Sequence, residues 1–136
     1  MADKKILIYQ TNQNQKYLEQ DEAMLIPRGY EVKSFLDSES TLAEAAKTPP
    51  DLFITSMGLK GNLDGLQFAR ALKADEKLKD IPIILLTAAR RVMHLPFNFV
   101  PDSVTFPVFD VIEKPVRPSY LYEVIDRALA SRADAK

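Results

Sequence analysis

The chain has no cysteine and one histidine, and these two scarcities exclude several chemistries. Without cysteine there is no disulfide framework, no thiolate zinc site and no thiol catalysis. The histidine, His94, lies in a segment interrupted by prolines, and a lone histidine defines no catalytic geometry. The sequence also shows no paired carboxylates, no metal-ligand cluster and no nucleophile with a neighbouring base. We therefore expect a protein that is not an enzyme and that carries no metal and no cofactor.

An excess of one charge and a long apolar run are also missing. The 18 basic and 19 acidic side chains are interspersed and leave a net charge of −1, so no basic stripe predicts a nucleic-acid partner. The longest apolar run begins at Ile81, is interrupted by Pro82 and is too short to span a membrane. The first five residues lack the apolar stretch of a signal peptide. We expect a cytoplasmic protein that does not bind membranes.

Apolar residues make up 46% of the 136 positions, which is typical of a globular chain. With no linker or repeat in the sequence, we expect a single domain over residues 1–136, with its core at about 4–130. Apolar runs and residue spacing predict alternating strands and helices. The predicted strands are Ile6–Tyr9, Glu31–Leu36, Leu52–Met57, Ile81–Leu86 and Val108–Ile112. The first predicted helix covers residues 14–26, with Tyr17, Leu18, Met24 and Leu25 inward. The second covers residues 42–47 and is opened by a Thr41–Glu44 capping box. A third is introduced by Asp64–Gly65, and a last helix starts at Pro118.

Five strands that alternate with helices predict a parallel α/β sheet with helices on both faces, a three-layer, doubly wound α/β/α fold. One segment departs from this pattern. Between Arg90 and Phe106 a helix is due, but Pro96, Pro101 and Pro107 disfavour a long regular one. We expect an irregular proline-rich segment that replaces or shortens the fourth helix.

Several short motifs, in order along the chain, carry a family resemblance: Ile6-Leu7-Ile8, Arg28-Gly29-Tyr30-Glu31-Val32, Pro50-Asp51-Leu52, Asp64-Gly65, Asp80 to Ala88 and Glu113-Lys114-Pro115-Val116. In their order and spacing the chain resembles a response-regulator receiver domain of bacterial two-component signalling, over about residues 4–129. The resemblance implies the flavodoxin-like (CheY-like) order of a five-stranded sheet. It also implies signalling by phosphoryl transfer from a histidine kinase to an aspartate, assisted by Mg²⁺.

The resemblance assigns roles to positions of this sequence, and several of them are substituted. The phosphoacceptor position is occupied by Ser56, and the acidic pair that helps to hold Mg²⁺ falls on Gln10 and Thr11. The hydroxyl and the lysine that contact the phosphoryl group are matched by Thr87 and Lys114. The aromatic switch position falls on Val111.

These substitutions oppose phosphoryl chemistry. Mg²⁺ prefers hard, charged oxygen ligands, and an amide and two hydroxyls carry no negative charge. A serine also needs a base to become a nucleophile, and no such base is evident near Ser56. Asp64 is the one nearby carboxylate that could accept a phosphoryl group instead, although an Asp-Gly pair before a helix is typical of an N-cap.

The leading hypothesis is therefore a stand-alone pseudo-receiver that acts by protein–protein interaction without aspartyl phosphorylation. Its partner would be a histidine kinase, another regulator, a target protein or a second copy of the chain. Two alternatives stay open: a phosphoacceptor modified at Asp64 or Ser56, and a flavodoxin-like module that binds a nucleotide or other small molecule. For the interaction surface the hypothesis names the apolar and aromatic side chains Phe97, Phe99, Val100, Phe106 and Tyr120, with inward packing of these side chains as an equal alternative.

Overall fold

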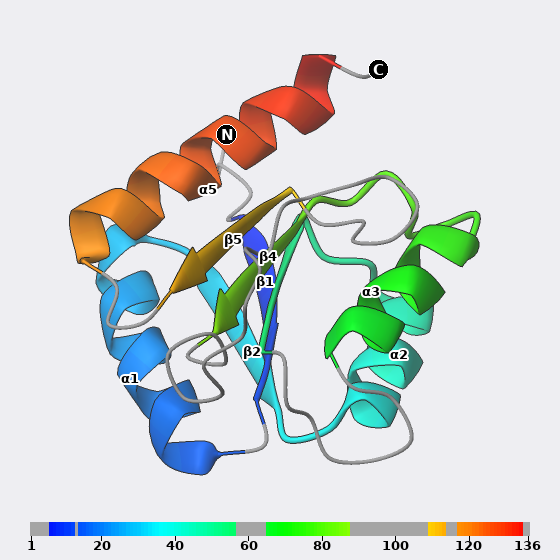
Figure 1. Cartoon of the computed structure of the whole chain (residues 1–136), viewed down its shortest axis with the longest axis horizontal. Coiled ribbons are helices and arrows are strands. Elements are labelled where there is room, and N and C mark those ends of the chain that lie inside the picture. Colours follow the sequence, from blue (N-terminus) through cyan, green and yellow to red (C-terminus); the bar gives the residue numbers. More distant parts are fainter. Residues whose placement is uncertain (1–5, 13, 57–64, 88–108, 114–116, 135–136) are drawn as a thin grey trace, which may run out of the picture.

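The computed structural model describes residues 6–12, 14–56, 65–87, 109–113 and 117–134. Its sheet has the strand order β2-β1-β3-β4-β5 with every neighbouring pair parallel, which is the flavodoxin-like order (Figure 1). The strands are β1 Leu7–Thr11, β2 Glu31–Phe35, β3 Leu52–Thr55, β4 Ile83–Thr87 and β5 Asp110–Glu113. The helices are α1 Gln15–Leu25, the 3₁₀ helix η1 Ile26–Arg28, α2 Ser38–Lys47, α3 Gly65–Ala74 and α5 Pro118–Asp134.

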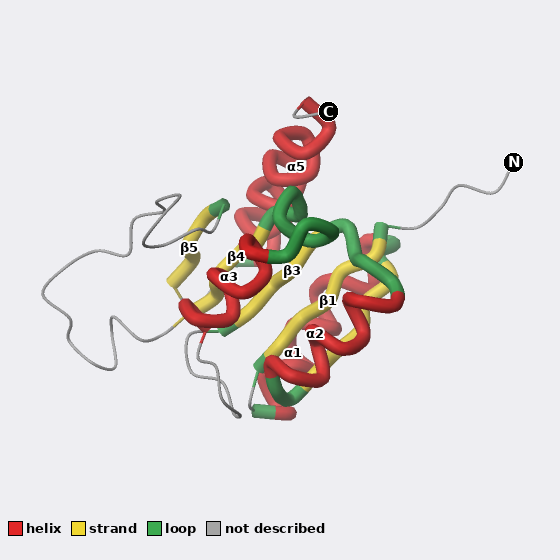
Figure 2. Tube along the Cα trace, turned by 90° about the vertical axis from the view of Figure 1, so that its right-hand side faces the viewer, coloured by secondary structure: helices red, strands yellow, loops and turns green. Residues whose placement is uncertain are grey.

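The helices cover both faces of the sheet, with α1 and α5 on one side and α2 and α3 on the other (Figures 1 and 2). Successive strand residues point to opposite faces, so Ile8 and Tyr9 of β1 enter different cores. On the first face Ile8 packs with Leu25 of α1 and with buried residues of α5. On the second face Tyr9 packs with Phe53 and with the apolar stripe of α3. The predicted doubly wound α/β fold with a parallel sheet is confirmed.

Two local predictions are wrong. Helix α2 begins at Ser38, four residues before the predicted start, because Asp37 and not Thr41 is its N-cap: the Asp37 carboxylate accepts a 2.6 Å hydrogen bond from Ser40 N. Tyr17, predicted to face inward, is 42% exposed, because Leu18 and Leu25 of the same helix fill the core. The predicted irregular segment at 90–107 lies outside the described residues.

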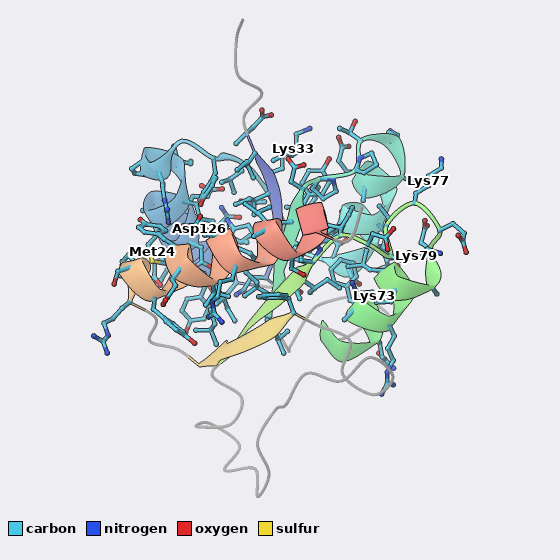
Figure 3. All side chains as sticks on the ribbon, turned by 90° about the horizontal axis from the view of Figure 1, so that it is seen from above. Met24, Lys33, Lys73, Lys77, Lys79 and Asp126 are labelled. Atoms are coloured by element: carbon cyan, nitrogen blue, oxygen red, sulfur yellow. The ribbon has the colours of Figure 1, made fainter. Side chains whose placement is uncertain are left out.

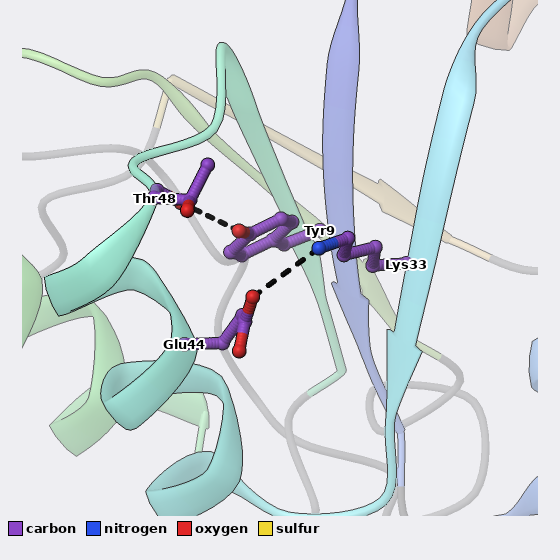
Figure 4. A network of polar contacts seen from close by, with 4 residues as sticks. All are labelled: Tyr9, Lys33, Glu44 and Thr48. Atoms are coloured by element: carbon purple, nitrogen blue, oxygen red, sulfur yellow. Dashed lines mark hydrogen bonds and ion pairs between the residues drawn. The ribbon is translucent and has the colours of Figure 1, made fainter.

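Tyr9 joins β1 to α2 through its buried ring. The ring makes edge-on contacts with Phe35 and Phe53, at centroid distances of 5.2 and 6.1 Å, and its hydroxyl donates to the carbonyl oxygen of Thr48 (Figure 4). Burial raises the pKa of the Tyr9 phenol, so the hydroxyl keeps its proton as a donor. Beside it, Lys33 of β2 forms a 3.2 Å ion pair with Glu44 of α2. These contacts fix α2 against the edge of the sheet.

Helix α5 is tied to the end of α1 by polar contacts at its rim. The Tyr122 hydroxyl donates a 2.6 Å hydrogen bond to the carbonyl of Met24. The Arg28 guanidinium lies 4.5 Å from the centroid of the Tyr122 ring and 2.9 Å from the Asp126 carboxylate. Figure 3 shows Met24 and Asp126 on adjoining parts of these two helices. Each of these contacts contributes roughly 0.5–1 kcal/mol to the unfolding free energy, so they supplement the apolar packing between α5 and α1.

Replacing Tyr9 with phenylalanine tests the link between β1 and α2. The Tyr9→Phe variant should lose about 1–2 kcal/mol of unfolding free energy, because the Thr48 carbonyl loses its donor while the ring stays in place. Urea denaturation measures the change. Tyr120→Phe is the matched control, since Tyr120 is 43% exposed and its loss of a hydroxyl should change stability by less than about 0.5 kcal/mol. Equal stability of Tyr9→Phe and the wild type would contradict the assigned role.

Candidate functional site

The candidate site lies at the carboxyl ends of the parallel strands, where open α/β sheets bind their ligands. β1 and β3 end side by side, because Thr11 is in register with Thr55 and the backbone N–H of Ser56 donates to the Thr11 carbonyl at 3.1 Å. On the other side of β3, the ends of β4 and β5 bring Thr87 into register with Glu113. The structure thus places Gln10, Thr11, Ser56 and the backbone of Thr87 at one edge of the sheet.

Gln10 is almost completely buried, with 1% of its surface exposed, and its amide group donates twice. Nε2 gives a 2.9 Å hydrogen bond to the carbonyl of Leu18 in α1 and a 2.7 Å bond to the hydroxyl of Ser34 in β2. The Ser34 hydroxyl in turn donates its proton to Glu22 Oε2. The Gln10 side chain therefore ties β1 to the helix and the strand that flank it.

The direction of these bonds makes an amide necessary at position 10. The Leu18 carbonyl is an acceptor only, and the one proton of Ser34 is directed to Glu22. Both neighbours thus need an N–H from position 10. The carboxylate of an aspartate or glutamate there has only acceptor oxygens, and it would face the Leu18 carbonyl and the Ser34 oxygen without a hydrogen bond. The amide oxygen Oε1 of Gln10 is buried and has no hydrogen-bond partner among the described residues.

Thr11 is directed to the opposite face of the sheet, toward the start of α2. Its hydroxyl lies 2.8 Å from the hydroxyl of Thr41, and the Thr41 hydroxyl donates at 2.9 Å to the carbonyl of Asp37. Because the proton of Thr41 is used there, Thr11 is the donor in the pair. The Thr11 side chain is 2% exposed, so its hydrogen bond is shielded from water.

The loop that follows β1 is organised by amide side chains. Asn12 Oδ1 accepts from the backbone N–H of Asn14 at 2.9 Å, and Asn14 Oδ1 accepts from the N–H of Lys16 at 3.0 Å. Asn14 is thereby the N-cap of α1. These side-chain oxygens are used by the backbone of the loop itself, which is a structural role.

The described side chains at this edge, those of Gln10 and Thr11, are neutral, and two described carboxylates close to them in the hydrogen-bond network have other functions. Glu22 accepts from Ser34, and Asp37 caps α2. Among the described residues, no three histidine, cysteine, aspartate or glutamate side chains gather where they could hold a metal ion. Gln10 and Thr11, which the resemblance matches to the acidic pair, thus do not fit Mg²⁺, because they offer no anionic oxygen and their donors are directed to protein acceptors.

Several predicted site residues are only partly described. Val111 is paired in register with Leu85 through the backbone, and nothing is described of its side chain or that of Thr87. Lys114 and Asp64 lie outside the described residues. So do four residues of the predicted interaction surface, namely Phe97, Phe99, Val100 and Phe106. Tyr120, the fifth, is 43% exposed in the first turn of α5.

Sequence reasoning missed the partners that hold the two substituted positions. Ser34, Glu22 and Thr41 all bond to this end of the sheet, directly or through one another, and none was predicted to belong to the site. One signal was present: Glu22 interrupts the apolar spacing of α1, as a residue with a polar partner on the core side would. The identity of that partner depends on the packing of α1 over β2, which spacing alone does not give.

Comparisons with known proteins agree with this architecture. The family model for the response regulator receiver domain matches residues 11–126. The response regulator PleD of Caulobacter vibrioides is 34% identical over 95 residues, which are 67% of this chain and 20% of PleD, so the chain spans about a fifth of that relative.

Two solved structures are similar over most of the chain. The signal receiver domain of a histidine kinase from Syntrophus aciditrophicus has a TM-score of 0.76 and 25% identity, covering 91% of this chain and 89% of that one. The receiver domain of the sensor histidine kinase PA1611 from Pseudomonas aeruginosa, solved with a magnesium ion in its active-site cleft, has a TM-score of 0.77 and 24% identity. The match covers 93% of this chain and 99% of that domain.

A charge at position 10 should be poorly tolerated. In Gln10→Glu, a buried carboxylate would face the Leu18 carbonyl, so we expect a loss of about 3 kcal/mol of unfolding free energy at pH 8. Burial raises the pKa of such a glutamate in the folded state above its unfolded value. The loss should therefore be smallest below the unfolded pKa of about 4.3 and should grow as the pH rises through the folded pKa.

The measurement is urea denaturation of Gln10→Glu and wild type at several pH values. Gln20→Glu is the control. Gln20 is exposed on α1, the helix that Gln10 contacts, so this substitution adds the same negative charge at a position in water. A Gln10→Glu variant as stable as the control at pH 8 would contradict the need for an amide at this position.

Proposed function

This chain belongs to the response-regulator receiver family of two-component signalling, and from that premise we propose that it signals by protein–protein interaction without conventional aspartyl phosphorylation. As part of the same proposal, it works in the cytoplasm and binds a histidine kinase, another regulator or a target protein. Because the chain spans about a fifth of PleD, its role as a stand-alone protein belongs to the proposal too.

The observation that carries the proposal is the hydrogen bonding of Gln10 and Thr11. Both side chains are buried, and both use their donors on protein partners: Gln10 on Leu18 and Ser34, Thr11 on Thr41. A site that binds a divalent ion and a phosphoryl group needs anionic ligands that are available to it. Here the two positions serve to hold the sheet edge to its helices.

The residue at the phosphoacceptor position supports the same conclusion. An ionised carboxylate attacks phosphorus directly, whereas the hydroxyl of Ser56 must first lose its proton to a base. The backbone of Ser56 is held by its neighbours: its N–H donates to the Thr11 carbonyl, and its carbonyl accepts from the Thr55 hydroxyl. The magnesium ion in the PA1611 receiver belongs to that protein, and the part of this chain that the structure describes gathers no group of three acidic, histidine or cysteine side chains that could hold such an ion.

For the partner, the proposal assigns the surface around the start of α5. Tyr120 is exposed there, and a partly exposed tyrosine supplies a large apolar area together with a polar hydroxyl. Phe97, Phe99, Val100 and Phe106 complete the proposed surface from the sequence. Aromatic residues of this kind dominate the energetics of many protein interfaces.

Exposure to a small phosphodonor tests the loss of phosphoryl chemistry. When the chain is incubated with acetyl phosphate and Mg²⁺, intact mass spectrometry should show no stoichiometric phosphoryl adduct, because no carboxylate is present at position 56. The melting temperature in millimolar Mg²⁺ should also equal the melting temperature in a sodium salt of the same ionic strength. A receiver domain known to be phosphorylated serves as the positive control in both measurements.

The same experiment separates the two alternatives. A phosphoryl group mapped to Ser56 or Asp64 would replace the proposal with the phosphoacceptor reading. A rise in melting temperature with nucleotides or flavins, in the absence of a phosphoryl adduct, would favour the small-molecule module instead.

Substitution of Tyr120 tests the interaction surface. Tyr120→Ala should reduce capture of the partner from source cells at least about tenfold, as expected when a central aromatic residue of an interface is truncated. Its unfolding free energy should change by less than about 0.5 kcal/mol, because Tyr120 is 43% exposed. Leu36→Ala, which truncates a 42% exposed apolar residue just after β2, is the matched control. If Tyr120→Ala captures the partner as well as the wild type does, the interface does not include Tyr120.

A further inference from the structure

Strand β2 forms one edge of the sheet, and its outer side pairs with no strand among the described residues. In a parallel pair each residue directs its N–H and its carbonyl to the same side, and that side alternates along the strand. The N–H of Glu31 and the carbonyl of Phe35 form hydrogen bonds of 2.9 and 3.1 Å with the residues that flank β1, so both face inward. Val32 and Ser34, at the alternate positions, therefore direct their backbone groups outward.

The outward groups of Val32 and Ser34 are those of an open strand edge. In the part of the chain that the structure describes, no loop or side chain is hydrogen-bonded to these backbone groups. Along β2 Glu31 is exposed and the other four residues are half-buried, so the strand can be approached from its side. A row of free N–H and carbonyl groups of this kind is a template for the addition of another strand.

The side chains of β2 carry two opposite charges on one face of the sheet. Glu31 and Lys33 are two residues apart, so they point to the same face, the one covered by α2. Figure 4 shows Lys33 on this face, beside Tyr9 and Glu44. The Lys33 side chain stays 42% exposed although its amine lies 3.2 Å from the Glu44 carboxylate. Both charges of β2 are thus accessible to a neighbouring strand.

This charge pattern is self-complementary when a second copy of β2 adds in the antiparallel direction about a twofold axis. Outward residues must face outward residues, so the axis passes through a residue of the strand. An axis through Glu31 or Lys33 would place like charges opposite each other. An axis through Val32 places Glu31 of each copy opposite Lys33 of the other. Of the five positions of β2, Val32 alone brings opposite charges of this strand face to face.

We propose that two copies of this chain pair through β2, in antiparallel orientation and with Val32 opposite Val32 of the second copy, so that their sheets become continuous. In this register the two valines exchange both backbone hydrogen bonds, and two ion pairs between Glu31 and Lys33 flank them. The pairing does not rest on the proposed function, because it involves neither Ser56 nor Tyr120.

Sedimentation velocity of the full chain tests the pairing. The wild type should change from monomer to dimer as its concentration rises from about 1 μM to about 1 mM. Glu31→Lys places two lysines opposite each other in both charge pairs, so it should weaken the dimer at least about tenfold. Glu76→Lys reverses an exposed charge in the turn after α3 and is the matched control, which should dimerise as the wild type does.

A complementary variant tests the register. Lys33→Glu, combined with Glu44→Gln so that no two carboxylates meet within the chain, places glutamates opposite each other and should also be mostly monomeric. An equimolar mixture with Glu31→Lys restores opposite charges in both pairs, so the mixture should dimerise nearly as tightly as the wild type. A mixture that stays monomeric, or variants that dimerise as the wild type does, would overturn the proposal. A wild type that is monomeric at about 1 mM would leave the edge to a strand of another protein and would overturn it too.

Hydrogen exchange followed by NMR locates the paired edge. In samples of about 1 mM, the outward N–H of Val32 should exchange several-fold more slowly in the wild type than in Glu31→Lys. The N–H of Lys33 is directed to β1 in both proteins, so its exchange should be alike and shows that the variant keeps its sheet. Equal exchange of Val32 in the two proteins would contradict pairing through β2.

Discussion

The amide of Gln10 is the interaction on which the carboxyl edge of the sheet depends. Its two N–H groups satisfy a buried helix carbonyl and a half-buried serine hydroxyl beside β1. Loss of those donors would leave the buried carbonyl of Leu18 without a partner, at a cost of about 1–3 kcal/mol. A metal site needs the opposite at this position, an anionic acceptor. One side chain does not serve both, so stability of the edge and binding of a divalent ion exclude each other here.

The same relation holds for Thr11 on the other face. Its hydroxyl donates to Thr41 inside α2, and Thr41 donates to the backbone of the residue that caps that helix. The side chains of Gln10 and Thr11 thus hold α1 and α2 to the sheet, one on each face. At both positions a hydrogen bond between uncharged groups avoids the cost of desolvating an ion.

Much of the fold follows from local patterns, because apolar runs such as Leu52–Ile54 suit strands that are covered on both faces. The residue types at the site were also evident in the sequence. Their partners were not, since Ser34 is 24 positions from Gln10 and 12 from Glu22, and only the packed sheet brings them together. The start of α2 was misplaced because Asp37 and Thr41 are both good caps. Thr41 is instead hydrogen-bonded to the Thr11 hydroxyl of β1, a contact between distant parts of the sequence that local patterns do not show.

These bonds also restrict how such a domain can switch. A ligand shifts a conformational equilibrium only by the difference in its affinity for the two states. With the donors of Gln10 and Thr11 used internally, these two side chains have few hydrogen-bond donors left to offer an anion. A partner that contacts α5 meets a different situation, because the rim bonds of Tyr122 and Arg28 to α1 and to Asp126 are each worth roughly 1 kcal/mol. Even a micromolar complex has a binding free energy of about 8 kcal/mol, so such contacts can be exchanged for those of a partner. Under the proposed function, the controlling event is therefore occupancy of the surface at α5, and the hydrogen-bonded edge at Gln10 and Thr11 acts as a support.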